Sequence, residues 1–95
     1  MIMIIRGRKT IEKFKTQNPL SRTPLNRWID ITAQANWKDL DELKATFPSC
    51  DYVPPYVVFN IGGNNYRMIA IVAFSKSEVL VVKLMTHNQY NRWKP

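Results

Sequence analysis

Residues 56–86 read YVVFNIGGNNYRMIAIVAFSKSEVLVVKLMT, three runs rich in β-branched residues that two turn sequences separate. Such side chains favour the pleated, half-buried surface of a sheet, so we predict three strands, Tyr56–Ile61, Asn65–Phe74 and Glu78–Thr86. Gly62-Gly63-Asn64 supplies residues that tolerate the positive φ angles of a tight hairpin turn. Ser75-Lys76-Ser77 provides the second turn, and the pattern therefore predicts a three-stranded antiparallel meander.

The residues before this meander show helical patterns. We predict a second helix that begins with Thr23 as its N-cap and Pro24 at its first position, both favoured there. A third, short helix is expected after Asp39, because Glu42 follows three residues later as in a capping box. The first helix should cover Lys9–Gln17.

The order of the elements predicts an α+β fold in one domain spanning residues 1–95. A short N-terminal strand, Met1–Ile5, and two to three helices should pack on an antiparallel sheet that the C-terminal meander completes. Residues Cys50–Pro55 are expected to form a loop. The tail after His87 is assigned neither a helix nor a strand.

The charge of the chain points to a polyanionic partner. It holds 14 Lys and Arg against 7 Asp and Glu, a net charge of +7, which attracts nucleic acid or an acidic protein. A basic surface kept for solubility is the alternative. The lone Cys50 favours a reducing compartment, and no targeting or bilayer-spanning segment is visible. We therefore expect a soluble cytoplasmic protein with no membrane partner.

Strand pairing brings several polar side chains together. If the second turn is centred on Lys76, Arg67 lies opposite Met85, with Lys83 and His87 as its diagonal neighbours. The first turn places Arg67 opposite Val58 or Asn60, so that Asn60 shares its face either way. Opposed Cβ atoms are about 5 Å apart and diagonal ones about 7–8 Å apart. A one-residue slip at either turn would separate the group.

These residue types suit metal-free RNA cleavage, in which a ribose 2′-hydroxyl attacks the adjacent phosphate. His87 is the only histidine and the side-chain type that changes charge near neutral pH. Arg67 offers a planar fork for phosphate oxygens, and Lys83 adds a point charge. Tyr90 can orient the nucleophile, donate a proton or stack on a base. Each residue also has a purely structural interpretation: a surface or core histidine, solvated cations, or an aromatic cover for the sheet.

Other chemistries lack their residues. Gly62-Gly63 is too short for a phosphate-cradling loop and precedes a strand. One histidine and one cysteine do not make a zinc site, and no nucleophile elbow is present. We therefore expect no metal and no cofactor.

Six stretches, in this order, carry a resemblance to a known family. They are Arg27-Trp28, Ala35-Asn36-Trp37-Lys38, Leu43-Lys44-Ala45-Thr46-Phe47-Pro48-Ser49, Val57-Val58-Phe59-Asn60-Ile61, Gly63-Asn64-Asn65-Tyr66-Arg67 and Thr86-His87-Asn88-Gln89-Tyr90. Over roughly Met3 to Arg92, the chain resembles the HigB-type toxins of bacterial type II toxin–antitoxin systems, within the RelE-like group of mRNA interferases.

The resemblance implies a compact RelE-like fold and ribosome-dependent endonucleolytic cleavage of mRNA without a metal. It also implies neutralisation by a HigA-type antitoxin with a helix-turn-helix domain, and contact with operator DNA only through that complex. By the family pattern, the site residues are Arg67, Lys83, His87 and Tyr90. Contacts to RNA are expected from Asn60, whose role is less clear, and from Arg92 and Lys94.

One position departs from the family pattern, which often has an acidic residue directly after the tyrosine. This chain has Asn91 there, so activity could be reduced. Two other functions remain open: a non-catalytic nucleic-acid-binding module, and a toxin of the same fold with another target such as DNA gyrase. The fold alone does not choose among them.

Overall fold

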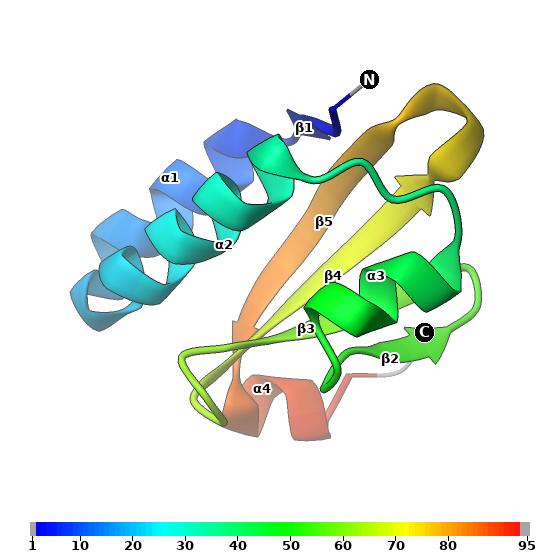
Figure 1. Ribbon diagram of the computed structural model, residues 1–95. Helices are drawn as coiled ribbons and strands as arrows, with labels where there is room; N and C mark the ends of the chain where they lie inside the picture. Colours follow the sequence, from blue (N-terminus) through cyan, green and yellow to red (C-terminus); the bar gives the residue numbers. More distant parts are fainter. Residues whose placement is uncertain (1, 94–95) are drawn as a thin grey trace.

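The computed structural model describes residues 2–93, and within them five strands form one mixed sheet (Figure 1). The strands are β1 (Ile4–Arg6), β2 (Asp51–Val53), β3 (Tyr56–Ile61), β4 (Tyr66–Ala73) and β5 (Glu78–Thr86). Their order in the sheet is β1-β5-β4-β3-β2. β1 runs parallel to β5, and every other pair is antiparallel. The α+β class and the three-stranded meander predicted from the sequence are confirmed.

Three helices cover one face of the sheet, which we call the covered face. They are α1 (Arg8–Gln17), α2 (Arg22–Gln34) and α3 (Leu40–Thr46), and a 3₁₀ turn, η1 (Pro19–Ser21), joins the first two (Figure 1). The main apolar cluster lies between helices and sheet, where Trp28 of α2 meets Phe59 of β3 at a ring distance of 5.4 Å. Burial of this apolar surface is the main force that holds the helices on the sheet.

The opposite face, which we call the open face, has a smaller apolar cluster. Val58, Ile69 and Met85 are buried there, and Tyr90 and Trp93 pack against them. These two aromatic residues belong to the C-terminal segment, which contains helix α4 (His87–Asn91). One end of the open face is therefore covered by the C-terminal segment rather than by α1–α3.

A β-bulge in β5 decides which side chains reach the open face. Ala70 pairs with Val81 and Ile69 pairs with Lys83, so that Val82 is an extra residue without a partner on β4. Before the bulge, Val79 and Val81 face the helices; after it, Leu84 takes that direction. Without the extra residue, the alternation of β5 would turn Lys83 and Met85 toward the helices.

The bulge also corrects the predicted turn. The connection between β4 and β5 spans four residues, Phe74–Ser77, with the 3₁₀ turn η2 (Phe74–Lys76) and Ser77 at φ 53°. The predicted turn centred on Lys76 is therefore wrong for the residue pairs next to the turn, where Ala73 pairs with Glu78. The register shift at Val82 then restores the predicted pairing of Arg67 with Met85.

Several local predictions were wrong or incomplete. The N-terminal strand covers Ile4–Arg6 rather than Met1–Ile5, and it lies parallel to β5, whereas an antiparallel sheet was predicted. Residues Asp51–Val53 form β2 rather than a loop, and pair with β3 across a Pro54-Pro55 turn. His87–Asn91 forms α4. The predicted N-cap Thr23 lies inside α2, because η1 runs directly into that helix at Arg22.

The predicted cap of the third helix is confirmed. Asp39 caps α3 by accepting a hydrogen bond from the backbone N–H of Glu42, while the Glu42 carboxylate accepts one from the Lys38 N–H. Gly7 ends β1 at φ 85°, where a Cβ would collide with the carbonyl oxygen of Val81. Across residues 2–93, no helix combines the length and the apolarity needed to cross a bilayer.

Candidate functional site

Arg67 is the centre of the polar cluster on the open face. It lies on β4, is only 7 % exposed, and pairs with Asn60 on one side and Met85 on the other. Its Nη1 donates to the carbonyl oxygen of Tyr66 at 3.0 Å, and its Nη2 donates to Asn64 Oδ1 at 2.6 Å. Within residues 2–93, no carboxylate lies within ion-pair distance of this guanidinium. Its charge is therefore buried and uncompensated, an arrangement that favours the approach of an anion.

His87 lies against this guanidinium. It is the first residue of α4, and its backbone N–H donates to the carbonyl oxygen of Asn65 at 2.9 Å, which ties the start of α4 to the β3–β4 turn. Its Nδ1 lies 3.3 Å from Nη2 of Arg67. A guanidinium has donors only, so this contact requires the lone pair of Nδ1 and leaves the proton of the neutral ring on Nε2. A hydrogen bond from Arg67 would thus orient the ring and favour the tautomer with its proton on Nε2.

Helix α4 is held in place by a capping box. The Thr86 hydroxyl accepts from the backbone N–H of Gln89 at 3.3 Å, and Gln89 Oε1 accepts from the backbone N–H of Thr86 at 2.9 Å. The sequence Thr86-His87-Asn88-Gln89 matches the capping-box pattern, so it could have predicted α4. The helix places Tyr90 one turn after His87.

The ring of Tyr90 also lies against the guanidinium of Arg67. The Arg67 Cζ lies 5.5 Å from the centre of the Tyr90 ring, a cation–π distance. Tyr90 is in turn stacked on Trp93, with ring centres 5.9 Å apart and planes at 23°, and Trp93 meets Tyr56 edge-on. Arg67, His87 and Tyr90 are thus brought together as the strand pairing predicted, although their roles stay predictions.

Asn60 is directly opposite Arg67, one of the two predicted registers. Its amide nitrogen donates to the carbonyl oxygen of Ser49 at 3.5 Å, a contact directed to the segment before β2. No contact between the Asn60 and Arg67 side chains is found in the described part of the chain. The geometry fits a structural role for Asn60 better than a direct contact with RNA.

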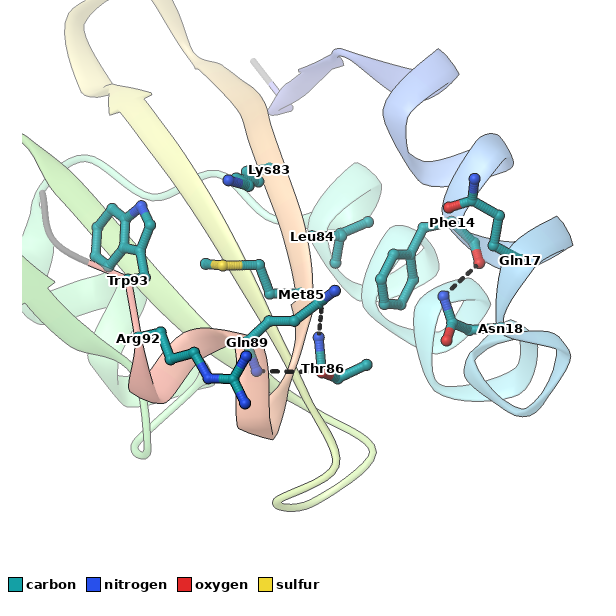
Figure 2. A pocket seen from close by; sticks show the side chains of 10 residues that line it. All are labelled: Phe14, Gln17, Asn18, Lys83, Leu84, Met85, Thr86, Gln89, Arg92 and Trp93. Atoms are coloured by element: carbon teal, nitrogen blue, oxygen red, sulfur yellow. Dashed lines mark hydrogen bonds between the residues drawn. The ribbon is translucent and has the colours of Figure 1, made fainter.

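No hydrogen bond or ion pair joins Lys83 to this cluster in the described part of the chain. Lys83 pairs with Ile69 on β5, is exposed, and lines a groove of about 440 Å³ that lies along β5 (Figure 2). We call this the β5 groove. It is lined by Phe14, Gln17, Asn18, Lys83, Leu84, Met85, Thr86, Gln89, Arg92 and Trp93. Arg92, another predicted RNA contact, lies here too, whereas the predicted contact Lys94 lies outside the described residues.

The sequence missed three residues of this region. Asn64 holds Arg67, and Gln89 and Trp93 line the β5 groove. Asn64 had been assigned to the turn only. Gln89 could have been found through the capping box, but nothing in the sequence pairs Asn64 with Arg67.

Cys50 and Glu78 have their contacts outside this cluster. Burial raises the pKa of the Cys50 thiol, which is 3 % exposed in the main apolar cluster. The Glu78 carboxylate forms an ion pair with Arg6 at 3.0 Å, and that hydrogen bond lowers its pKa. Over residues 2–93, no three His, Cys, Asp or Glu side chains gather as a metal site would need.

Comparison with known proteins decides the family. Residues 21–93 match the model of the HigB toxin family, described as the RelE-like toxic component of a toxin–antitoxin system. The chain belongs to the HigB toxin family. Its five-stranded mixed sheet and its helices are consistent with a compact RelE-like toxin fold. The match begins at η1, so it includes the whole polar cluster and most of the β5 groove.

Three relatives illustrate the similarity. The chain is 33 % identical over 86 residues to the mRNA interferase toxin HigB of Escherichia coli (strain K12), which covers 87 % of this chain and 83 % of that protein. The mRNA interferase HigB of Shigella flexneri gives the same values. The mRNA interferase HigB of Escherichia coli O6:H1 is 24 % identical over 93 residues, with 95 % and 90 % coverage.

Proposed function

We propose that this HigB-family toxin is an endoribonuclease that cleaves messenger RNA at the open face of its sheet. The names of its relatives describe mRNA interferases. The observation that carries the proposal is the 3.3 Å contact between a buried arginine, which pairs with no carboxylate in the described part of the chain, and the only histidine of the sequence. A binding module has no need of an imidazole held against a guanidinium.

The proposed reaction forms a bond between the ribose 2′-oxygen and the phosphorus, and breaks the bond between that phosphorus and the 5′-oxygen. The 2′-hydroxyl loses a proton and the leaving 5′-oxygen gains one. His87 takes part through Nε2, because Arg67 occupies its Nδ1. Arg67 stabilises the negative charge that grows on the phosphate oxygens, an effect that a buried site strengthens.

Tyr90 is the second group that we assign to the reaction. Its ring lies against Arg67, so its position is tied to that of His87 through the same guanidinium. Its phenol can donate a proton or orient the 2′-hydroxyl. Lys83 contributes charge from the adjoining β5 groove rather than direct contact with His87.

We further propose that cleavage occurs on the ribosome, needs no metal, and is carried out by a single toxin domain spanning residues 1–95. The site offers few groups for chemistry, so alignment of the mRNA by the ribosome would supply much of the rate. A HigA-type antitoxin with a helix-turn-helix domain would neutralise the toxin and carry it to operator DNA. The net charge of +7 supports contact with both rRNA and an acidic partner.

Mapping of RNA 5′ ends after induction of the chain tests the proposed activity. The wild-type chain should create new 5′ ends inside coding regions, and His87→Ala should create none at equal protein level. Asn88→Ala, at the next and exposed position of α4, is the matched control and should cleave normally. Purified chain, ribosomes and mRNA, with and without EDTA, test the two finer claims. Intact transcripts in wild-type cells that nevertheless stop growing would overturn the proposal in favour of another target.

A further inference from the structure

The β5 groove leaves part of strand β5 open, with no other part of the described chain over it. β1 pairs with β5 only from Glu78 to Leu80, so the edge of β5 beyond Leu80 carries no strand. Helix α1 forms one wall through Phe14 and Gln17, and the segment from Gln89 to Trp93 forms the other (Figure 2). A second hollow of about 290 Å³ continues the groove toward Thr10 and Lys13, and shares Lys83 and Leu84 with it.

The charge of this groove has one sign. Lys83 and Arg92 line it and Lys13 lines its continuation, while neither hollow is lined by an acidic residue. None of the three cations has an ion-pair partner among residues 2–93. Three cations along one groove, with no partner in the part of the chain that the structure describes, favour an extended anion.

The groove also contains an aromatic surface that is continuous with the proposed site. Trp93 lines the groove and is stacked on Tyr90, whose ring faces Arg67. Thr86 lines the groove immediately before His87 in the chain. A strand bound at the reacting groups can therefore pass over Tyr90 and Trp93 into the groove.

We propose that the β5 groove binds the single-stranded RNA segment next to the scissile linkage, with a base stacked on Trp93 and phosphates held by Lys83 and Arg92. This inference rests on the proposed function and adds the path of the substrate. Cations that follow the backbone, together with an aromatic ring for a base, are the combination that binds single-stranded nucleic acid. An acidic peptide could use the cations and the free edge of β5, but it would have no need of the indole of Trp93.

The groove assignment changes the role of Lys83. The strand pairing placed it among the catalytic groups, but its side chain lines the β5 groove beside Arg92 and Trp93. We therefore assign Lys83 to RNA binding. Removal of the Lys83 side chain should weaken RNA binding by the contribution of one phosphate contact, and should not abolish cleavage.

Tryptophan fluorescence tests this proposal directly. Trp28 and Trp37 are 2 % and 3 % exposed, so quenching by RNA reports on the partly exposed Trp93. The probe is a short single-stranded oligoribonucleotide at low salt, and the protein is the full chain carrying His87→Ala, which prevents cleavage. RNA should quench the fluorescence. Trp93→Phe should abolish the quenching and keep the affinity within a few-fold, because a phenyl ring still stacks, whereas Trp93→Leu should weaken binding roughly tenfold.

Charge variants provide the second readout on the same background. Lys83→Ala and Arg92→Ala should each lower the slope of log affinity against log salt by about 0.7, the value for one phosphate contact on a single strand. Lys44→Ala removes an exposed cation from α3, outside the groove, and is the matched control. Equal effects of all three substitutions, or no quenching, would overturn the groove assignment. Equal quenching by poly-L-glutamate would assign the groove to an acidic peptide instead.

The experiments distinguish failure of the cleavage proposal from failure of the groove proposal. If wild-type chain cleaves mRNA but the groove variants bind like Lys44→Ala, the enzyme stands and the groove does not. If the groove variants lose RNA affinity but wild-type chain produces no new 5′ ends, the groove stands and the cleavage does not.

Discussion

The covered face of the sheet buries Phe59, Met68 and Val79 under three helices, whereas the open face buries Val58, Ile69 and Met85 beside a cation. The covered face gives most of the apolar burial, and therefore most of the stability. The open face carries the polar cluster, where the Arg67 charge pairs with no anion among the described residues. Substitutions on the first face should change folding, and substitutions on the second should change activity. Each prediction below tests this separation.

The largest effect is expected from His87 on the open face. His87→Ala removes the group that exchanges protons with the reacting oxygens, and should lower the cleavage rate about 10²- to 10⁴-fold. Its ring is half-exposed at the start of α4, so the midpoint of thermal unfolding should stay close to that of wild type. Cleavage of a reporter mRNA and calorimetry measure the two quantities. A collapse of stability that accounts for the lost activity would break the comparison.

Phe59→Ala tests the covered face. Phe59 is 1 % exposed and meets both Trp28 and Phe47 edge-on, so its removal leaves a cavity among aromatic rings. The free energy of unfolding should fall by about 3–5 kcal/mol. Chemical denaturation measures the loss. Any protein that remains folded should still cleave, because Phe59 does not touch the polar cluster.

Two buried cations sharpen the comparison between the faces. Lys15 is 8 % exposed and bonds to Glu12 and Asn26, whereas Arg67 pairs with no carboxylate among residues 2–93. Lys15→Met should cost about 1–2 kcal/mol of stability, because polar partners are left behind. Arg67→Met also leaves polar partners behind, at Asn64 and Tyr66, but it removes a buried charge that no described carboxylate pairs with, so it should cost no more stability than Lys15→Met; it should slow cleavage about 10²- to 10³-fold. Denaturation curves of both variants decide this, and a larger loss at Arg67 would contradict the account.

The smallest effect is expected from the cap of α4. Thr86→Ala removes the hydroxyl that accepts from the Gln89 N–H, and should destabilise by about 1 kcal/mol. His87 is then less firmly positioned, and cleavage should fall only several-fold. Thr86→Ser keeps the hydroxyl and should restore both values. Unchanged cleavage in Thr86→Ala would mean that the cap does not position the site.

Much of the open face could be predicted from the sequence, because the centre of a hairpin turn determines which residues of the two strands lie opposite each other. It placed Arg67 opposite Met85 and on the same face as Asn60, and both pairs are present. The assumed turn was nevertheless wrong, and the bulge at Val82 compensates for it. Bulges depend on how both faces pack, so a single strand sequence does not reveal them.

The remaining misses have other physical causes. β2 is three residues long, so its pairing partner rather than its own pattern makes it a strand. The bonds that hold Arg67 depend on the conformation of the β3–β4 turn, which carries Asn64. The division between the Arg67 cluster and the β5 groove required the positions of side chains around β5. For that reason Lys83 was grouped with the catalytic residues.

A double-mutant cycle on Arg67 and His87 tests the central claim most directly. Cleavage rates of Arg67→Met, His87→Ala and the double variant are compared with that of wild type under identical conditions. If Arg67 acts by positioning His87 and by stabilising negative charge at the same site, the double variant should be no slower than the slower single variant. Rate losses that multiply would show that the two residues act independently, and would contradict the account.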